Sequence, residues 1–424
     1  MHRLFSLSDR KFLIACLAVH ISLRIAVLLA FPVTQTSDFD WYYQAALGIA
    51  AGKGYAQDGV LTAFWPVGWP GFLGLLFRIF GPRQLVGQLA NLVLSAASIV
   101  LITVIGSRSF GDKRVGRVAA VIVALLPNQV AYVPLLSTEI YYEFLLLAAV
   151  FCLLRNRLAF TAAAGLIFGI ATLTKAQSLL IPLILLIAIG FYEGKQRDIS
   201  ASLKKLFLVY AMMFIVIAPW TIRNYYVLGA FVPVSTNGGV TLLTGNNPTA
   251  RGDFTPSDPL YAELSQLPQD QVQVDAIAKK RAFDWIAHNP GRFIALIPLK
   301  IWRLWAPDGD GEWFYQAGYS HYDEHVMAFR AVRIFNQFLY VVLAILAVPA
   351  LRFLVPGREP LANMPQAGWV FVLYFTLISV VFSGQSRFHF SLIPWIAMYG
   401  AYTALHWLPA WRGRARPTAT EPVR

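Results

Sequence analysis

The feature that most constrains this chain is a series of long apolar runs, several close to the roughly 20 residues that an α-helix needs to cross a bilayer. The runs are continuous and do not alternate with polar residues, so they are typical of helices and not of the strands of a β-barrel. Of the 424 residues, 57% are hydrophobic and only 13% are charged. Soluble domains do not have this composition. The sequence therefore predicts an all-α polytopic membrane protein.

We predict about ten membrane-spanning helices, within a range of nine to twelve. They fall at about residues 12–32, 85–106, 117–136, 140–155, 158–174, 177–192, 204–219, 327–351, 368–383 and 389–408. The first run begins near Lys11 and has no small-residue cleavage site after it, which favours a retained span over a signal peptide. Cys16 and Cys152 lie inside apolar runs, so they offer neither a disulfide framework nor a zinc site.

The positive charges of the chain mark one side of the membrane. Lys and Arg number 35 against 22 Asp and Glu, and they form short clusters between apolar runs. Such clusters indicate topology anchoring and contact with anionic membrane lipid, and not nucleic acid as a partner. With the spans above, all of the clusters fall on the same side, which we predict to be the cytoplasm. A basic cytoplasmic tail, 409–424, follows the transmembrane module 1–408.

The same charge parity reassigns two apolar segments. If Pro66–Phe80 were a span, the Arg108–Arg117 cluster would lie outside, and if Phe293–Trp305 were one, the basic tail would lie outside. We predict that both are helices in the outer membrane interface. Two polar loops then face the outer side, one at about 34–83 and one at about 221–326.

Two acids stand just outside the first span, in the segment Thr36-Ser37-Asp38-Phe39-Asp40-Trp41-Tyr42. A carboxylate among aromatic rings is partly desolvated and can act as a base. The alternative is that Asp38 or Asp40 caps a helix running from Trp41 to Ala51.

Two further charged residues stand at outer ends of predicted spans. Glu139 follows Ser137 and Thr138, a pairing that is also ordinary at the start of a helix. Lys175 lies in a very short outer turn, where it could hold a lipid phosphate or simply extend to the interface.

The second outer loop is rich in turn formers and short polar side chains. It contains Trp220-Thr221-Ile222-Arg223-Asn224, then Ser235-Thr236-Asn237-Gly238-Gly239 and Gly245-Asn246-Asn247-Pro248. Irregular segments of this kind could cradle a sugar or a phosphate, although each alone could be a plain surface turn.

A last outer turn, Ser386-Arg387-Phe388-His389, precedes the final span. Arg387 suits a fork-like grip on phosphate oxygens, or it anchors the helix at the interface. His389 could be a pH-sensitive group or an interfacial donor. No metal-ligand spacing of His or acidic residues is visible.

In this order, these segments resemble the GT-C superfamily of membrane glycosyltransferases. The match is closest to the bacterial branch related to dolichyl-phosphate-mannose protein mannosyltransferases and to the transferases that decorate lipid A. It runs from about Asp38 to Pro394 and is most specific over residues 219–248. We expect no soluble C-terminal domain like that of the larger members. The fold implied is a GT-C-like bundle with interfacial helices in the first outer loop.

The resemblance implies transfer of a sugar from a polyprenyl-phosphate carrier to a lipid, glycan or protein acceptor, with inversion of the anomeric centre. The reaction would take place at the outer, periplasmic face of a bacterial cytoplasmic membrane. The resemblance leaves room for a divalent cation but establishes no cofactor.

The resemblance also assigns roles to single residues of this chain. Asp38 would be the general base and Asp40 its substitute, with Glu139 in support. Lys175, Arg223 and Arg387 would bind the donor phosphate, although Phe388 stands where the family usually has tyrosine. Substrate contacts would come from Tyr42, Asn224, Asn237, Asn246 and His389.

Two alternatives remain open at this point. A flippase or transporter for lipid-linked sugars would place ionisable residues midway through spans and would show internal repeats; the first span contains only His20 and Arg24, and no convincing repeat is found. A polysaccharide polymerase or ligase would share the outer arginines but use a pyrophosphate-linked donor. A nucleotide-sugar donor is disfavoured because the cytoplasmic loops are short.

Overall fold

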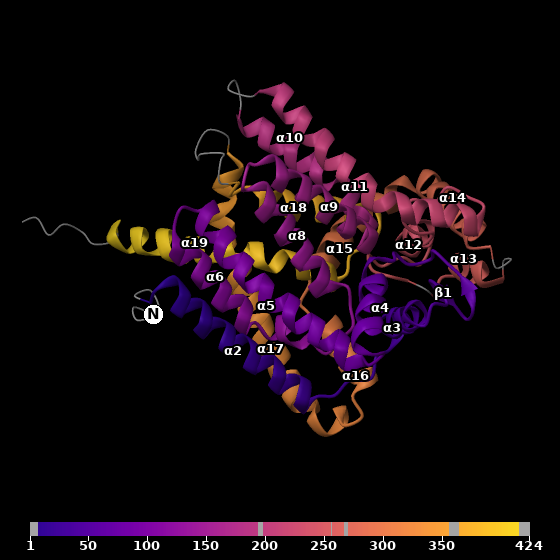
Figure 1. The fold of residues 1–424 in the computed structure, drawn as a ribbon, viewed down its shortest axis with the longest axis horizontal. Helices are drawn as coiled ribbons and strands as arrows, with labels where there is room; N and C mark the ends of the chain where they lie inside the picture. The colour runs from indigo at the N-terminus through magenta and orange to yellow at the C-terminus, as the bar shows by residue number, and fades with distance from the viewer. Residues whose placement is uncertain (1–6, 194–197, 256, 267–269, 356–363, 415–424) are drawn as a thin grey trace, which may run out of the picture.

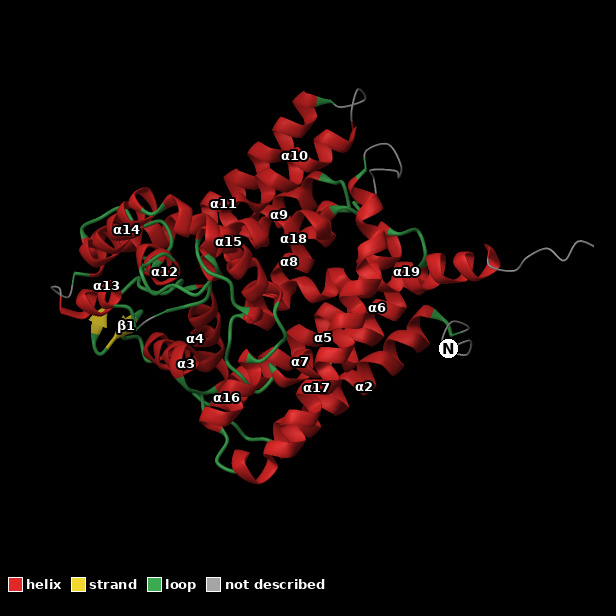
Figure 2. Cartoon of the chain, turned by 180° about the vertical axis from the view of Figure 1, so that it is seen from behind, coloured by secondary structure: helices red, strands yellow, loops and turns green. Residues whose placement is uncertain are grey.

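The structure is a computed structural model that describes residues 7–193, 198–255, 257–266, 270–355 and 364–414. It is a helical bundle with a smaller group of helices at one end (Figure 1). The short helices α12 to α14 and the strand β1 lie at that end, together with α3 and α4. The N-terminus and the last turns of α19 lie at the opposite end in both views (Figures 1 and 2).

The helices of the bundle are α2 (Asp9–Ala30), α5 (Gln84–Ser109), α6 (Lys113–Leu125), the short α7 (Pro127–Ala131), α8 (Glu139–Leu153), α9 (Leu158–Thr174), α10 (Ile181–Glu193), α11 (Ile199–Leu228), α17 (Tyr322–Ala347), α18 (Ala367–Val381) and α19 (Ile393–Arg414). The 3₁₀ helices η1 (Ala176–Leu180), η4 (Val348–Leu354) and η6 (Ser386–Leu392) lie between them in the chain. The first outer loop holds α3 (Ser37–Ala50), the antiparallel strands β1 (Ala56–Gln57) and β2 (Val60–Leu61), and α4 (Gly68–Phe80). The second holds α12 (Gly238–Gly245), α13 (Pro259–Ala262), η3 (Glu263–Gln266), α14 (Gln271–His288), α15 (Pro290–Trp305) and α16 (Asp310–Gly318).

The predicted helical membrane fold is confirmed. Among the described residues, four helices are long and apolar enough to cross a bilayer, namely Asp9–Ala30, Gln84–Ser109, Ile199–Leu228 and Tyr322–Leu354. Shorter apolar helices surround them, including Leu158–Thr174 and Ala367–Val381. The helix α8 is central, because most of its residues are buried and none is exposed. The total of about ten spans stays a prediction.

The third predicted span, 117–136, is wrong as a continuous helix. α6 ends at Leu125, Pro127 begins the short helix α7, and the chain is irregular from there to Thr138. Proline cannot donate the hydrogen bond that would continue the helix. Irregular backbone away from water needs other partners for its polar groups.

Buried side chains supply those partners. The carbonyl of Pro134 accepts hydrogen bonds from Gln35 and Gln88, and Asn91 donates to the carbonyls of Val133 and Leu135. The indole of Trp69 donates to the carbonyl of Leu136, 2.8 Å away. The irregular segment is therefore stabilised by specific hydrogen bonds, and it ends at Glu139, the first residue of α8.

The structure agrees with the charge parity for several clusters. Asp9, at the start of α2, pairs with Lys113 and Arg117 of α6 at 2.7 Å each, so these two positive clusters share one end of the bundle. Lys205 of α11 donates to Asn156, in the turn between α8 and α9, which adds a third. Which side of a membrane this end faces stays a prediction, and most of the basic tail 409–424 lies outside the described residues.

The two segments predicted as interfacial are both helical. Pro66–Phe80 becomes α4 and Phe293–Trp305 lies within α15, which has Pro298 inside it. α12, η3 and α14 form a small core of their own, made of Val240, Leu242, Leu243, Leu264, Ala278 and Ala282. The second loop is thus a compact unit against the bundle.

Candidate active site

The first candidate acid lies at the start of α3. Thr36 precedes the helix without a side-chain capping bond, and both Asp38 and Asp40 fall in its first turn, so neither acid takes the capping position. The carboxylate of Asp38 accepts a hydrogen bond from the guanidinium of Arg387 at 2.7 Å, and both side chains are mostly buried. The turn before the last helix therefore meets the first outer loop at Asp38.

A second ion pair lies beside the first. The ammonium of Lys175 is 3.3 Å from the carboxylate of Glu139, which is only 3% exposed. Lys175 also lies over the rings of Tyr142 and Phe388, at 5.2 and 5.7 Å. Glu139 is the first residue of α8, and Lys175 follows the last residue of α9. The two side chains therefore meet at the same end of this helix pair.

Tyr42 connects the two ion pairs. Burial raises the pKa of its phenol well above the usual value, and the charges of Asp38 and Glu139 raise it further, while Arg387 acts in the opposite direction. Burial lowers the pKa of the Arg387 guanidinium, but the carboxylates of Asp38 and Glu139 more than offset this and raise it overall. Each charge therefore influences the others. We call Asp38, Tyr42, Glu139, Lys175 and Arg387 the ion-pair cluster.

Aromatic side chains form a wall next to the cluster. The ring of Trp65 lies 6.1 Å from that of Tyr42, and Trp41 contacts both Tyr42 and Tyr55 edge-on. The hydroxyl of Tyr55 donates to the carbonyl of Trp65. Sequence reasoning did not single out Tyr55, whose only signal is that aromatic residues are dense on both sides of it.

Arg223 lies behind this wall and not in the cluster. Its guanidinium donates to the backbone carbonyls of Thr62 and Tyr55 at 2.7 and 3.0 Å, and it stacks on Trp220. It thereby fastens the hairpin of the first outer loop to α11. In this structure its hydrogen bonds go to backbone, so any contact with a donor phosphate stays a prediction.

The three asparagines predicted to contact substrate lie outside the ion-pair cluster. Asn224 is fully buried and donates to the carbonyl of Val232, while Asn237 accepts from the hydroxyl of Ser235. Asn246 is fully buried as well, and its side-chain oxygen accepts a 2.7 Å hydrogen bond from Lys300. These asparagines hold the second outer loop in shape.

Asp40 and His389 also lie apart from the two ion pairs. Asp40 accepts from Gln44 on the same helix. His389 is fully buried, stacked between Trp305 and Tyr340, with its two ring nitrogens 2.6 Å from the carbonyl oxygen of Leu304 and 2.9 Å from a carboxylate oxygen of Asp308. Sequence reasoning missed Asp308, because 81 residues separate it from His389 and no local pattern marks it.

The described residues contain no group of three or more His, Cys, Asp or Glu side chains placed to hold a metal ion. Asp38 and Glu139 are the carboxylates of the cluster, and each is paired with a cation. The arrangement is a mostly buried site with two carboxylates, two cations and an aromatic wall. A carboxylate there could accept a proton while the cations stabilise a developing negative charge.

A protein-family model described as dolichyl-phosphate-mannose-protein mannosyltransferase matches residues 66–222. The matched segment includes Glu139 and Lys175. No characterised protein sequence matches the chain at a significant level.

Solved structures resemble the fold over nearly its whole length. The oligosaccharyltransferase of Archaeoglobus fulgidus, solved with zinc and sulfate, has a TM-score of 0.54 at 17% identity and covers 95% of this chain and 50% of its own. The same organism's oligosaccharyltransferase AglB, in complex with an inhibitory peptide and a dolichol-phosphate, has a TM-score of 0.52 at 14% identity. The match covers 97% of this chain and 52% of that one. ArnT from Cupriavidus metallidurans, bound to undecaprenyl phosphate, has a TM-score of 0.45 at 14% identity. The match covers 95% of this chain and 79% of that one.

The chain therefore spans about half the length of the oligosaccharyltransferases it matches. Identities this low establish the fold alone. The predicted resemblance to the GT-C superfamily is confirmed at that level, with the family model in support over residues 66–222.

Proposed function

We propose, from the GT-C fold and the partial family match, that this protein transfers a sugar from a polyprenyl-phosphate carrier to an acceptor. The observation that carries the proposal is the ion-pair cluster, in which Asp38–Arg387 and Glu139–Lys175 meet at one end of the bundle. We place that end at the periplasmic face of a bacterial cytoplasmic membrane, because the positive clusters lie at the other end. The sugar is a hexose or a pentose, and the acceptor is a lipid, a glycan or a protein.

The residues divide the reaction between them. The oxygen of an acceptor hydroxyl attacks the anomeric carbon, and Asp38 takes the proton from that hydroxyl. The bond between the anomeric carbon and the phosphate oxygen breaks, and its electron pair leaves with the polyprenyl phosphate. Arg387 and Lys175 stabilise the added negative charge of the leaving phosphate. Attack from the face opposite the phosphate inverts the anomeric centre.

The charges of the cluster suit this chemistry. Asp38 and Glu139 balance Arg387 and Lys175, so the site is close to neutral before a donor binds. An incoming phosphodiester would face two cations already held in place, which reduces the cost of ordering them. Glu139 is buried against Lys175 and orients the ammonium group.

The aromatic wall supports a sugar ligand. Trp41, Tyr55 and Trp65 present ring faces and edges beside Tyr42. Flat apolar rings with a few polar groups are what a ligand pocket needs to hold a ring-shaped, partly apolar molecule.

The experiment compares Asp38→Asn with wild-type protein in proteoliposomes that contain a polyprenyl-phosphate sugar. We expect the variant to fold and bind donor but to lose transfer, because an amide cannot accept the proton. Asp40→Asn is the matched control and should keep most of the activity. Full activity of Asp38→Asn would remove Asp38 from the mechanism. Mass spectrometry of envelope glycolipids, with and without the protein, would identify the acceptor.

The flippase alternative has one observation in its favour. His20, Arg24 and Glu143 are buried within the helices α2 and α8, and such residues often mark transport paths. Here, however, Arg24 donates to the carbonyls of Ala124 and Gln129, which fall at the break after α6. Movement of a labelled polyprenyl-phosphate sugar across the bilayer without transfer would favour the flippase.

The polymerase or ligase alternative differs only in its donor. A pyrophosphate-linked donor carries one more phosphate, and so one more negative charge, than a monophosphate-linked donor. Turnover of a pyrophosphate-linked donor in preference to a monophosphate-linked one would favour this reading.

A further inference from the structure

A second charged site lies at the other end of the helices that carry Glu139 and Lys175. α8 starts at Glu139 and runs for 15 residues to Leu153, so its far end is about 20 Å away at 1.5 Å per residue. α9 returns from Leu158 to Thr174, next to Lys175. The turn between the two helices is therefore the opposite pole of the candidate active site.

A cavity of about 370 Å³ opens at this turn. Its lining consists of Arg108, from the last turn of α5, with Leu154, Arg155, Arg157 and Phe160. Three arginine side chains thus line one hollow, together with Leu154 and Phe160. The guanidinium of Arg155 is steadied by the rings of Phe151 and Phe160, at 4.7 and 5.8 Å.

The cavity is strongly positive. Within the part of the chain that the structure describes, no carboxylate forms an ion pair with Arg108, Arg155 or Arg157. Lys205 is a further positive charge nearby, because its ammonium donates a 2.8 Å hydrogen bond to Asn156, which lies between Arg155 and Arg157 in the chain. By contrast, the neighbouring Lys113 is neutralised by Asp9.

The start of α9 adds to the positive electrostatic potential at the cavity. Arg157 precedes the helix and makes no side-chain capping bond to its first turn. The amide groups of a first turn without a cap favour an anion. Guanidinium groups beside such a turn match the oxygens of a phosphate.

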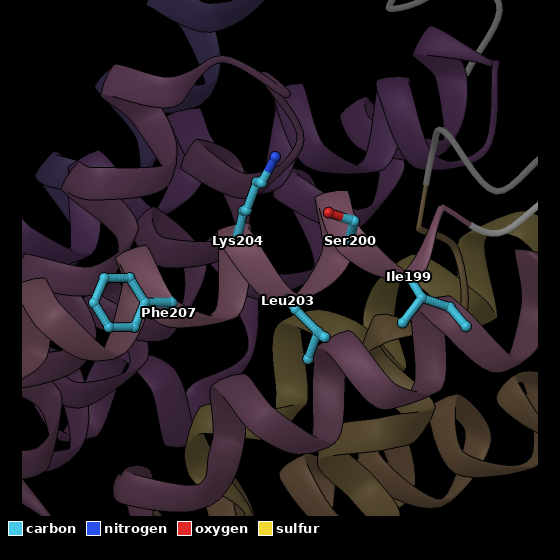
Figure 3. Close-up of a pocket in the computed structure, with 5 residues that line it drawn as sticks. All are labelled: Ile199, Ser200, Leu203, Lys204 and Phe207. Carbon is cyan, nitrogen blue, oxygen red and sulfur yellow. The ribbon is translucent and has the colours of Figure 1, made fainter.

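Apolar surface lies at the same end of the bundle. α9 and α11 run in parallel, since Gly165 abuts Val209 and Gly169 abuts Met213. The beginning of α11 is therefore level with the cavity. On the face of α11 turned away from α9, an open hollow of about 630 Å³ is lined by Ile199, Ser200, Leu203, Lys204 and Phe207 (Figure 3). Phe207 is 76% exposed, as expected for a residue that faces lipid chains.

We propose that the cavity lined by Arg108, Arg155 and Arg157 binds the phosphate of an anionic phospholipid. The position at the ends of apolar helices puts the arginines at the depth of lipid headgroups. The site is independent of the proposed sugar transfer.

The experiment uses the full chain in phosphatidylcholine nanodiscs with increasing amounts of phosphatidylglycerol, and measures lipid retention by native mass spectrometry. We expect the wild type to retain phosphatidylglycerol over phosphatidylcholine. In Arg155→Gln/Arg157→Gln we expect the apparent Kd for phosphatidylglycerol to rise roughly 30-fold, since each cation at headgroup depth contributes about fivefold to the affinity and the two factors multiply.

The matched control is Arg10→Gln/Lys11→Gln, which removes two exposed charges from the same end of the bundle. It should change the apparent Kd by less than about threefold, because screened charges outside the cavity act weakly. Equal losses in both variants would show diffuse attraction and overturn the site.

Two further outcomes would also overturn the proposal, and neither depends on a variant that folds. One is a wild-type protein with no preference for phosphatidylglycerol. The other is displacement of the lipid by millimolar inorganic phosphate, which would assign the cavity to free phosphate.

Discussion

Replacing His389 with alanine separates a structural role from the substrate contact that the sequence predicts. The ring is fully buried and lies between Trp305 and Tyr340. Removing a buried ring of this size costs about 3–5 kcal/mol through lost packing and the cavity left behind. Asp308 would also lose its 2.9 Å partner, and a buried polar group left unpaired costs about 1–3 kcal/mol.

The expected loss is therefore about 4–8 kcal/mol, a large part of the 5–15 kcal/mol that stabilises a typical protein. The partners explain the size of the effect. Asp308 also accepts a 2.8 Å hydrogen bond from Asn336 of α17. The pair thus joins α17, the end of α15 and the turn that carries Arg387.

The assay is denaturant unfolding of the purified protein in detergent, followed by transfer kinetics at a temperature where the variant stays folded. Asp308→Asn is the companion variant, because it keeps the shape but weakens the hydrogen bond, and it should cost about 1–3 kcal/mol. We expect lower stability with the donor KM little changed. The reasoning is refuted if His389→Ala unfolds like the wild type but has a much higher donor KM, since the ring would then be a substrate contact.

Three other predictions concern the charges around the site. Lys175→Gln should reduce transfer about 100-fold or more, with Lys175→Arg retaining part of it; an unchanged rate would exclude a role for this cation. Arg223→Gln should lower stability by about 1–3 kcal/mol and speed proteolysis of the hairpin at residues 55–62, whereas unchanged cleavage would show that the hairpin is held by other contacts. Burial lowers the pKa of Lys300 from its usual 10.5 to about 8, so the unfolded chain binds the extra proton between those values and stability should rise with pH across that window. The gain is at most about 3 kcal/mol, and identical pH profiles for wild type and Lys300→Met would contradict it.

Much of the fold could be predicted from the chain because its signals are local. A run of apolar residues needs a helix wherever it meets lipid, since only a helix or a closed barrel satisfies the backbone there. The clusters of Lys and Arg similarly predict which helix ends lie together. The pairing of Asp9 with Lys113 and Arg117 agrees with that prediction.

The break at Pro127 shows where hydropathy alone fails. The apolar run continues to residue 136, so hydropathy alone extends the helix. Pro127 follows the end of α6 at Leu125, and polar side chains from distant segments, among them Gln35, Gln88 and Asn91, satisfy the irregular backbone beyond it.

The sequence by itself determined a helical membrane protein with Asp38, Glu139, Lys175 and Arg387 at helix ends on one side. Only the tertiary structure decided which of the polar residues meet. It joined Asp38 to Arg387, 349 positions apart, while Arg223, Asn246 and His389 went to backbone carbonyls, a buried lysine and Asp308. The physical reason is that side-chain type and spacing fix which element a residue occupies. Which partner a buried polar group finds depends on packing between elements far apart in the chain.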